Sequence, residues 1–113
     1  MAPVLTLTRG TIVIAALKGD KPRPSLVVQS DLFNTTAQQS FTVIPFTSEI
    51  IAAPVFRLTF DPTPSNGLTK VSQLMVDKVT FVYRERMGAI VGQFADDEMI
   101  RVTRAMALWL GLT

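Results

Sequence analysis

The hydrophobic residues of this chain change their spacing near the C-terminus, and this change limits the fold more than any other feature. Before residue 95 they come in short β-branched or aromatic runs such as TIVIAAL (11–17) and FTVIPF (41–46). Pro, Gly and an Asn-Gly pair separate these runs, as turns separate strands. From Asp97 to Leu110 the apolar residues instead step by three and four, which indicates one helix. The residues on its apolar face are Met99, Val102, Met106 and Trp109.

We expect strands at 11–17, 26–29, 41–46, 55–60, 71–76 and 79–83, and a strand or extended connection at 88–94. Residues 30–34 read as a turn or one helical turn, and residues 34–40 as an exposed polar loop. Pro45 is expected at the edge or end of its strand, because proline donates no ladder hydrogen bond. The fold class is therefore mainly β with a C-terminal helix (α+β overall), a small curved sheet or half-open barrel. At 113 residues, one domain over 1–113 is expected.

The chain has no His and no Cys. This excludes a Ser-His-Asp triad, a thiolate nucleophile, a zinc finger and any disulfide framework. Any catalysis must then use carboxylates, Arg, Lys, hydroxyl groups or Tyr83.

Charged residues are scarce: 11 Lys and Arg stand against 9 Asp and Glu, and together they make 18% of the chain. Soluble domains average about 25%. The shortfall predicts that a partner or a second copy covers part of the surface, unless Thr, Ser and Gln cover it instead. The net charge of +2 permits nucleic-acid binding without arguing for it.

No membrane span is expected, because apolar runs such as 12–17 are far shorter than the roughly 18 to 20 residues that cross a bilayer. The opening MAPVLTLTRG lacks a basic segment followed by a long apolar stretch. We therefore expect no signal peptide and a cytoplasmic protein.

Five short motifs follow one another along the chain: RGTIV (9–13), RP (23–24), LVVQSDLFN (26–34), P-x-TS (45–48) and SQ-x-x-VDK (72–78). In this order and spacing the sequence resembles the MazF/PemK/Kid toxins of type II toxin–antitoxin systems. The resemblance runs from Arg9 to the C-terminal helix, which is nearly the whole chain.

The resemblance implies a homodimer of an SH3-like barrel that acts as a sequence-specific endoribonuclease on single-stranded RNA. It implies no metal and no cofactor. The ribose 2′-OH would attack the adjacent phosphate, leaving a 2′,3′-cyclic phosphate and a 5′-OH. A cognate antitoxin would block the site with a flexible, usually acidic segment, and operator DNA would be contacted only through the antitoxin complex.

Three residues match the catalytic positions of that family. The Arg23 guanidinium suits the charge that builds on phosphoryl oxygens, and it can also donate a proton to the leaving oxygen. The Thr47 and Ser48 hydroxyls can donate to phosphate. The competing interpretations are an ordinary loop arginine and two residues that cap a turn.

RNA-binding positions are predicted at Lys21, Lys70, Ser72, Gln73 and Asp77. Gln73 could instead be a solvent-facing strand residue, and Asp77 could simply pair with Lys78. The chain departs from the plasmid toxin Kid, which carries Arg and Asp where Lys70 and Ser72 align here. Ser72 cannot replace a carboxylate base. Asp20 and Asp77 are the nearby acids in the sequence, and the group that deprotonates the 2′-OH is left open. The loop at 18–23 is also shorter than in Kid-like members, which leaves the cleavage sequence open.

Two other functions compete with RNA cleavage. The segments VVQSDLFN (27–34) and VIPFTS (43–48) also resemble the gyrase poison CcdB, a binding toxin without catalysis. That family ends in Trp-Gly-Ile, whereas this chain ends in WLGLT, and CcdB-like members lack the Arg-Pro pattern. The departures at Lys70 and Ser72 motivate the second alternative, a catalytically weakened module that only binds its antitoxin.

Overall fold

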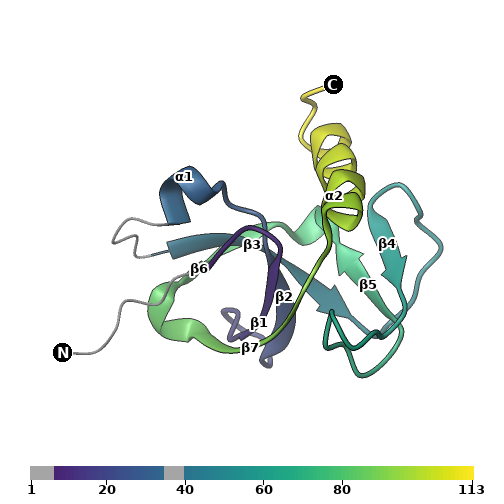
Figure 1. Cartoon of the computed structure of the whole chain (residues 1–113). Coiled ribbons are helices and arrows are strands. Elements are labelled where there is room, and N and C mark those ends of the chain that lie inside the picture. Colours follow the sequence, from purple (N-terminus) through teal and green to yellow (C-terminus); the bar gives the residue numbers. More distant parts are fainter. Residues whose placement is uncertain (1–6, 35–39) are drawn as a thin grey trace.

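A computed structural model describes residues 7–34 and 40–113, so residues 35–39 of the expected polar loop lie outside the described residues. The described residues form seven antiparallel strands, two α-helices and two 3-10 turns (Figure 1). In chain order these are β1 (Thr11–Ala15), β2 (Arg23–Val27), α1 (Asp31–Asn34), β3 (Ser40–Thr47), β4 (Arg57–Phe60), β5 (Ser72–Met75), η1 (Val76–Lys78), β6 (Thr80–Tyr83), η2 (Arg84–Arg86), β7 (Met87–Gln93) and α2 (Asp96–Trp109). The predicted class, mainly β with a C-terminal helix, is confirmed, and the sheet does not close into a full barrel.

Strand β3 organises the sheet because it changes partner along one of its edges. It pairs with β2 on one side, and on the other side its first half pairs with β6 and its end with β5. The strand order is β4-β5-β3-β2-β1-β7, with β6 joined to β3. The sheet therefore divides at β3 into a five-stranded part and a smaller part made with β4 and β5.

Pro45 lies inside β3, so its predicted place at the edge or end of a strand is wrong. Its only aligned partner in the described sheet is Ser25 of β2, because β6 pairs no further than Val43 and β5 begins to pair at Phe46. The missing proline N–H thus falls where the partner strand on the other side changes.

Both faces of the sheet are buried at its central strands β1, β2 and β3. Neighbouring residues of one strand, such as Ile12 and Val13, belong to two different apolar clusters because side chains alternate across a sheet. One cluster includes Leu58 and Phe60 of β4 together with the apolar face of α2. Burial on both faces explains why the strands read as continuous apolar runs rather than as alternating ones.

Helix α2 packs on the sheet through Met99, Val102 and Ala105. Its predicted apolar face is confirmed at Met99 and Val102, while Trp109 is 46% exposed with its ring 5.4 Å from that of Phe56. At the start of the helix, Glu98 Oε1 accepts a hydrogen bond from the Ala95 N–H at 2.8 Å, which caps the first turn.

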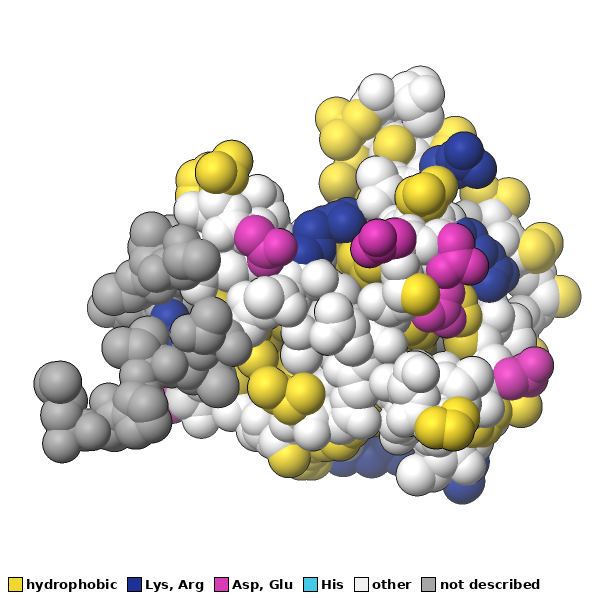
Figure 2. All heavy atoms as spheres, in the orientation of Figure 1, with side chains coloured by type: hydrophobic (Ala, Val, Ile, Leu, Met, Phe, Trp, Pro, Cys, Tyr) yellow, Lys and Arg dark blue, Asp and Glu magenta, His cyan; other side chains and the backbone are white. Residues whose placement is uncertain are grey.

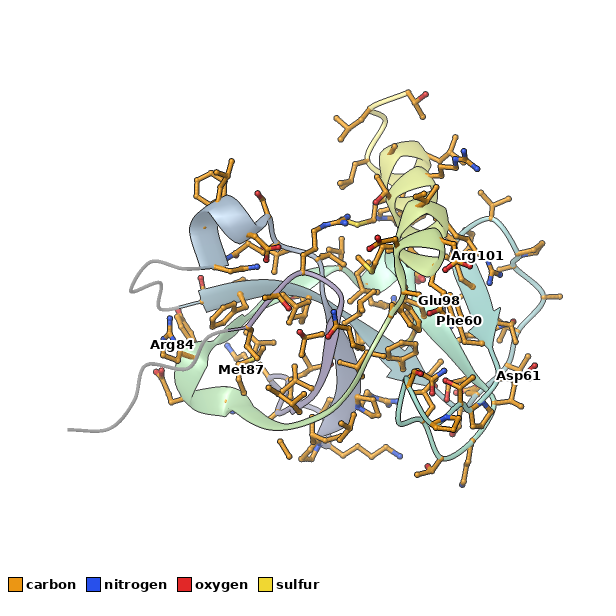
Figure 3. All side chains as sticks on the ribbon, in the orientation of Figure 1. Phe60, Asp61, Arg84, Met87, Glu98 and Arg101 are labelled. Atoms are coloured by element: carbon orange, nitrogen blue, oxygen red, sulfur yellow. The ribbon has the colours of Figure 1, made fainter. Side chains whose placement is uncertain are left out.

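Arg101 on the flank of α2 lies over the ring of Phe60, with the guanidinium carbon 4.7 Å from the ring centre (Figure 3). This cation–π contact ties the helix to β4.

Among the described residues, no helix is long and apolar enough to cross a membrane.

Candidate active site

Strand pairing brings three distant segments together at one end of the sheet. Antiparallel pairing of β2 with β3 sets the start of β2 beside the end of β3, and pairing of β3 with β5 sets the start of β5 there too. An open pocket of about 210 Å³ lies at this junction. Six of the eight predicted site residues line it: Lys21, Arg23, Thr47, Ser48, Lys70 and Ser72.

The pocket is basic. Lys21, Arg23 and Lys70 contribute three cationic side chains to its wall. Clustered positive charge around a concave surface attracts polyanions and raises their local concentration.

Arg23 is the first residue of β2, not a residue of a free loop as its alternative interpretation held. Its Nε donates to Asp20 Oδ2 at 2.6 Å, and its Nη2 lies 3.5 Å from Asp20 Oδ1. Its Nη1 donates to the Phe46 carbonyl of β3 at 3.5 Å. These contacts hold the guanidinium over the pocket while leaving further N–H donors of the fork for a ligand.

Asp20 is held in its ionised form by the same contacts. The hydrogen bond from the Arg23 side chain, followed by one from the Lys21 backbone N–H, lowers the pKa of the Asp20 carboxyl below its usual value. Asp20 was one of the two acids that the sequence left open as a base, and it is the one that contacts Arg23.

Thr47 is buried at the end of β3, and Ser48 is exposed beside it. The Thr47 Oγ1 accepts a hydrogen bond from the Glu49 N–H at 3.1 Å, so the turn-capping interpretation describes part of its role. The Thr47 hydroxyl proton is still available to donate, because the cap uses only a lone pair of the oxygen. Capping and pocket lining are therefore compatible for this residue.

The opposite wall comes from the loop between β4 and β5, which is built around a buried asparagine. Asn66 is 1% exposed, and its side chain accepts from the Thr63 and Leu68 N–H groups, each at 3.0 Å, and donates to the Asp61 carbonyl at 2.9 Å. The Asn-Gly pair predicted a turn here. Nothing in the sequence pattern indicated that the Asn66 side chain would be buried and would hold the loop together. This loop presents Leu68, Thr69 and Lys70 to the pocket.

Ser72 lines the pocket, and its hydroxyl is bound to the backbone two residues earlier in the chain. Its Oγ donates to the Lys70 carbonyl at 2.9 Å. This contact fixes the end of the loop where Lys70 joins β5.

Gln73 and Asp77 lie outside this pocket. Gln73 is 3% exposed, so its alternative interpretation as a solvent-facing residue is wrong. Asp77 in η1 accepts from Arg57 Nε at 2.7 Å and Nη2 at 3.1 Å, and Lys78 is farther away at 3.7 Å. The Arg57 contact lowers the pKa of Asp77, and sequence reasoning missed it because the two residues are distant along the chain.

The described residues contain no group of three or more His, Cys, Asp or Glu side chains placed to hold a metal ion. What the pocket offers chemically is a forked guanidinium, hydroxyl donors, two lysines and one adjacent carboxylate. These groups suit recognition of a phosphodiester and charge stabilisation on its oxygens.

Comparison with known proteins identifies the family. Residues 8–110 match the family of PemK-like, MazF-like toxins of type II toxin–antitoxin systems. A curated relative, the probable endoribonuclease MazF of Mycolicibacterium smegmatis, is 45% identical over 109 residues, covering 94% of this chain and 98% of the relative. The chain therefore belongs to the PemK/MazF toxin family, and the resemblance that its motifs carried is confirmed.

Solved structures agree on the fold. The Mycobacterium tuberculosis toxin MazF-mt6 superimposes with a TM-score of 0.80 at 22% identity, covering 91% of this chain and 98% of that one. A mycobacterial endoribonuclease in complex with its cognate antitoxin superimposes with a TM-score of 0.78 at 20% identity, covering 96% and 98%.

Proposed function

We propose that this protein is the toxin of a type II toxin–antitoxin module and cleaves single-stranded RNA at short specific sequences without a metal ion. The observation that carries the proposal is the convergence of Arg23, Thr47 and Lys70 on one basic pocket at the end of the sheet. The name of the 45% identical relative, a probable endoribonuclease, supports the reaction class. We further propose that residues 1–113 act as one toxin domain in the cytoplasm.

In the proposed reaction the ribose 2′-oxygen attacks the adjacent phosphorus, and the bond from phosphorus to the 5′-oxygen breaks. The products are a 2′,3′-cyclic phosphate and a 5′-OH. Negative charge builds on the phosphoryl oxygens, and the free N–H donors of Arg23 stabilise it together with the Thr47 and Ser48 hydroxyls. Arg23 donates a proton to the leaving 5′-oxygen and is reprotonated with the proton that the base has taken from the 2′-OH.

Asp20 is the base in this proposal. Its carboxylate is 36% exposed and contacts Arg23 beside the pocket, whereas the Asp77 carboxylate is 11% exposed and lies outside the pocket, and the Ser72 hydroxyl is directed to a carbonyl. The carboxylate is ionised at neutral pH and can therefore accept the 2′-OH proton, although its lowered pKa makes it a weaker base than a free carboxylate. Lys21 and Lys70 supply point charges that hold the RNA backbone.

We propose a homodimer formed through an apolar surface made by residues 50–56 and the C-terminal end of α2. Ile50, Ile51 and Val55 are all more than two-fifths exposed, and the ring contact of Phe56 with Trp109 joins the two segments. Hydrophobic side chains gather at this end of α2 in Figure 2.

An acidic antitoxin segment would cover the basic pocket, as charge complementarity favours, and operator DNA would be contacted only through that complex.

The test is incubation of the purified protein with a long single-stranded RNA in EDTA, followed by mapping of the new ends. Cyclic phosphate and 5′-OH ends support the proposal. The Arg23→Ala variant should cut no RNA, whereas Arg104→Ala, which changes an exposed arginine on α2, should cut normally. Failure of the folded wild type to cut any RNA would favour the antitoxin-binding module, and inhibition of DNA supercoiling by gyrase would favour the CcdB-like alternative.

A further inference from the structure

The side-chain amide of Gln73 is hydrogen-bonded to the backbone of Ile51. Its Oε1 accepts from the Ile51 N–H at 3.1 Å, and its Nε2 donates to the Ile51 carbonyl at 2.9 Å. The second Nε2 hydrogen is directed to Thr59 Oγ1 at 3.2 Å on the neighbouring strand β4. The amide thus pairs with Ile51 as a strand backbone would, using one acceptor and one donor on the same planar group.

This contact fixes the far end of the segment 48–51, which follows the pocket residue Thr47. Gln73 of β5 is aligned with Thr47, the last residue of β3. Residues 48–51 follow Thr47, and they are fixed at one end by the Thr47 cap on Glu49 and at the other by the Gln73 amide. Two of the hydroxyls that line the pocket, those of Thr47 and Ser48, therefore belong to a segment held at both ends.

We propose that Gln73 is a positioning residue for the proposed ribonuclease site, and that it does not contact RNA. Its side chain is 3% exposed, and both of its N–H donors are used inside the protein. Its amide fixes residues 48–51 and thereby holds the Thr47 and Ser48 hydroxyls where they meet the phosphate. This inference rests on the proposed function.

The chain offers a matched control. The amide of Gln29 also holds the protein together, donating to Asn34 Oδ1 at 2.9 Å and accepting from the Thr42 N–H at 3.1 Å. Gln29 does not line the basic pocket. A Gln→Met change at either position keeps the side-chain length and removes the amide. Gln73→Glu would keep the acceptor for the Ile51 N–H but would place a second acceptor against the Ile51 carbonyl.

The experiment measures single-turnover cleavage of one RNA over a range of protein concentrations, together with hydrogen exchange of the Ile51 amide. Gln73→Met should lower the maximal rate by about tenfold to a hundredfold, as expected when reacting groups lose their positions. The half-saturating protein concentration should stay near that of the wild type, because binding contacts are kept. Ile51 exchange should accelerate. Gln73→Glu should lower the maximal rate at least as much as Gln73→Met, because a buried carboxylate oxygen would face the Ile51 carbonyl. Gln29→Met should leave both kinetic constants unchanged.

Three results would overturn the inference. An unchanged maximal rate with weaker RNA binding in Gln73→Met would make Gln73 a direct RNA contact. Unchanged Ile51 exchange would show that the amide does not hold the segment. Faster exchange with unchanged cleavage would show that the segment does not position the hydroxyls. Failure of the wild type to cut RNA would overturn the proposed function itself, and the exchange measurement distinguishes that failure from loss of the Gln73–Ile51 contact.

Discussion

The Asp20 carboxylate lies 2.6 Å from the Nε of Arg23, just before β2 begins. Two oxygens of Asp20 face the Nε and Nη2 edge of the guanidinium, while Nη1 reaches the Phe46 carbonyl of β3. The orientation of Arg23 therefore depends on the fork geometry of its side chain. A lysine could supply the charge, but it could not make these directional contacts together.

Arg23→Lys should lower RNA cleavage by about a hundredfold or more, the scale on which loss of a fixed charge-stabilising donor acts. Single-turnover kinetics at saturating protein would measure this. RNA binding, measured by fluorescence anisotropy, should weaken far less, because the positive charge is kept. The control Arg104→Lys changes an exposed arginine and should behave as the wild type. A cleavage rate near that of the wild type in Arg23→Lys would show that a point charge is sufficient.

The role of Asp20 predicts a pH dependence. Because Arg23 lowers the pKa of Asp20 below its usual value, the carboxylate is ionised and able to accept a proton at every pH above about 4. The kcat/KM of the wild type should then fall only in acid below about pH 4, the range set by an unperturbed carboxyl. Asp20→Asn should abolish most cleavage at all pH values, and a fully active Asp20→Asn variant would eliminate Asp20 as the base.

The Arg57–Asp77 pair makes a separate prediction about stability. Both side chains are about nine-tenths buried, with 12% and 11% of each exposed, and Arg57 lowers the pKa of Asp77. A carboxyl with a lowered folded pKa stabilises the fold above its unfolded pKa of about 3.9, and this stabilisation disappears as the pH falls through the folded value.

Asp77→Asn should therefore cost about 1–3 kcal/mol of unfolding free energy at pH 7, as expected when a charged hydrogen-bond partner is removed. The difference from the wild type should shrink as the pH falls below about 4. Urea unfolding at pH 7 and in acid measures both values. Equal differences at the two pH values would contradict the ion pair as the cause.

The fold could be predicted from the sequence because its signals are local. The strands at 11–17 and 41–46 are short apolar runs bounded by turn residues, the helix from Asp97 has a helical period, and the structure places elements at all three. The partner change of β3 could not be predicted, because it depends on which strand lies next to each half of β3. Pro45 shows the consequence, since its position only makes sense once that change is known.

The candidate site shows the same difference between local signals, which a sequence carries, and long-range contacts, which it does not. Arg23, Thr47 and Lys70 were found through motifs, and strand pairing brings them to one pocket. The role of Asn66, which holds the loop that carries Lys70, and the pairing of Arg57 with Asp77 outside the pocket were not predicted. A buried amide and a long-range ion pair leave no periodic signal in a single sequence. The prediction of Gln73 as an RNA-binding position rests on its motif, which does not show that the residue is buried.

Gly92 of β7 lies against the backbone of the loop that forms one wall of the pocket. A Cβ at Gly92 would lie 2.2 Å from the Asn66 carbonyl oxygen and 2.6 Å from that of Ser65. Gly92→Ala must therefore displace the loop that presents Leu68 and Lys70. We expect a loss of about 1–3 kcal/mol in unfolding free energy, typical of overpacking, together with weaker RNA cleavage. Ile90→Ala, at an exposed side chain on the same strand, should leave cleavage intact, and normal cleavage by Gly92→Ala would show that this loop does not shape the pocket.

The proposed dimer surface can be tested by placing a charge on it. Val55 is 62% exposed within the apolar surface of residues 50–56 and the end of α2. Light scattering at micromolar concentration should give the wild type about twice the chain mass of 12.4 kDa, and Val55→Asp the mass of a single chain, because a carboxylate would be desolvated in the interface. Leu32→Asp places the same charge on α1, at a side chain that is 80% exposed, and should remain a dimer. A wild-type mass of one chain would reject the dimer while leaving the pocket chemistry untouched, since every group assigned to the reaction comes from one chain.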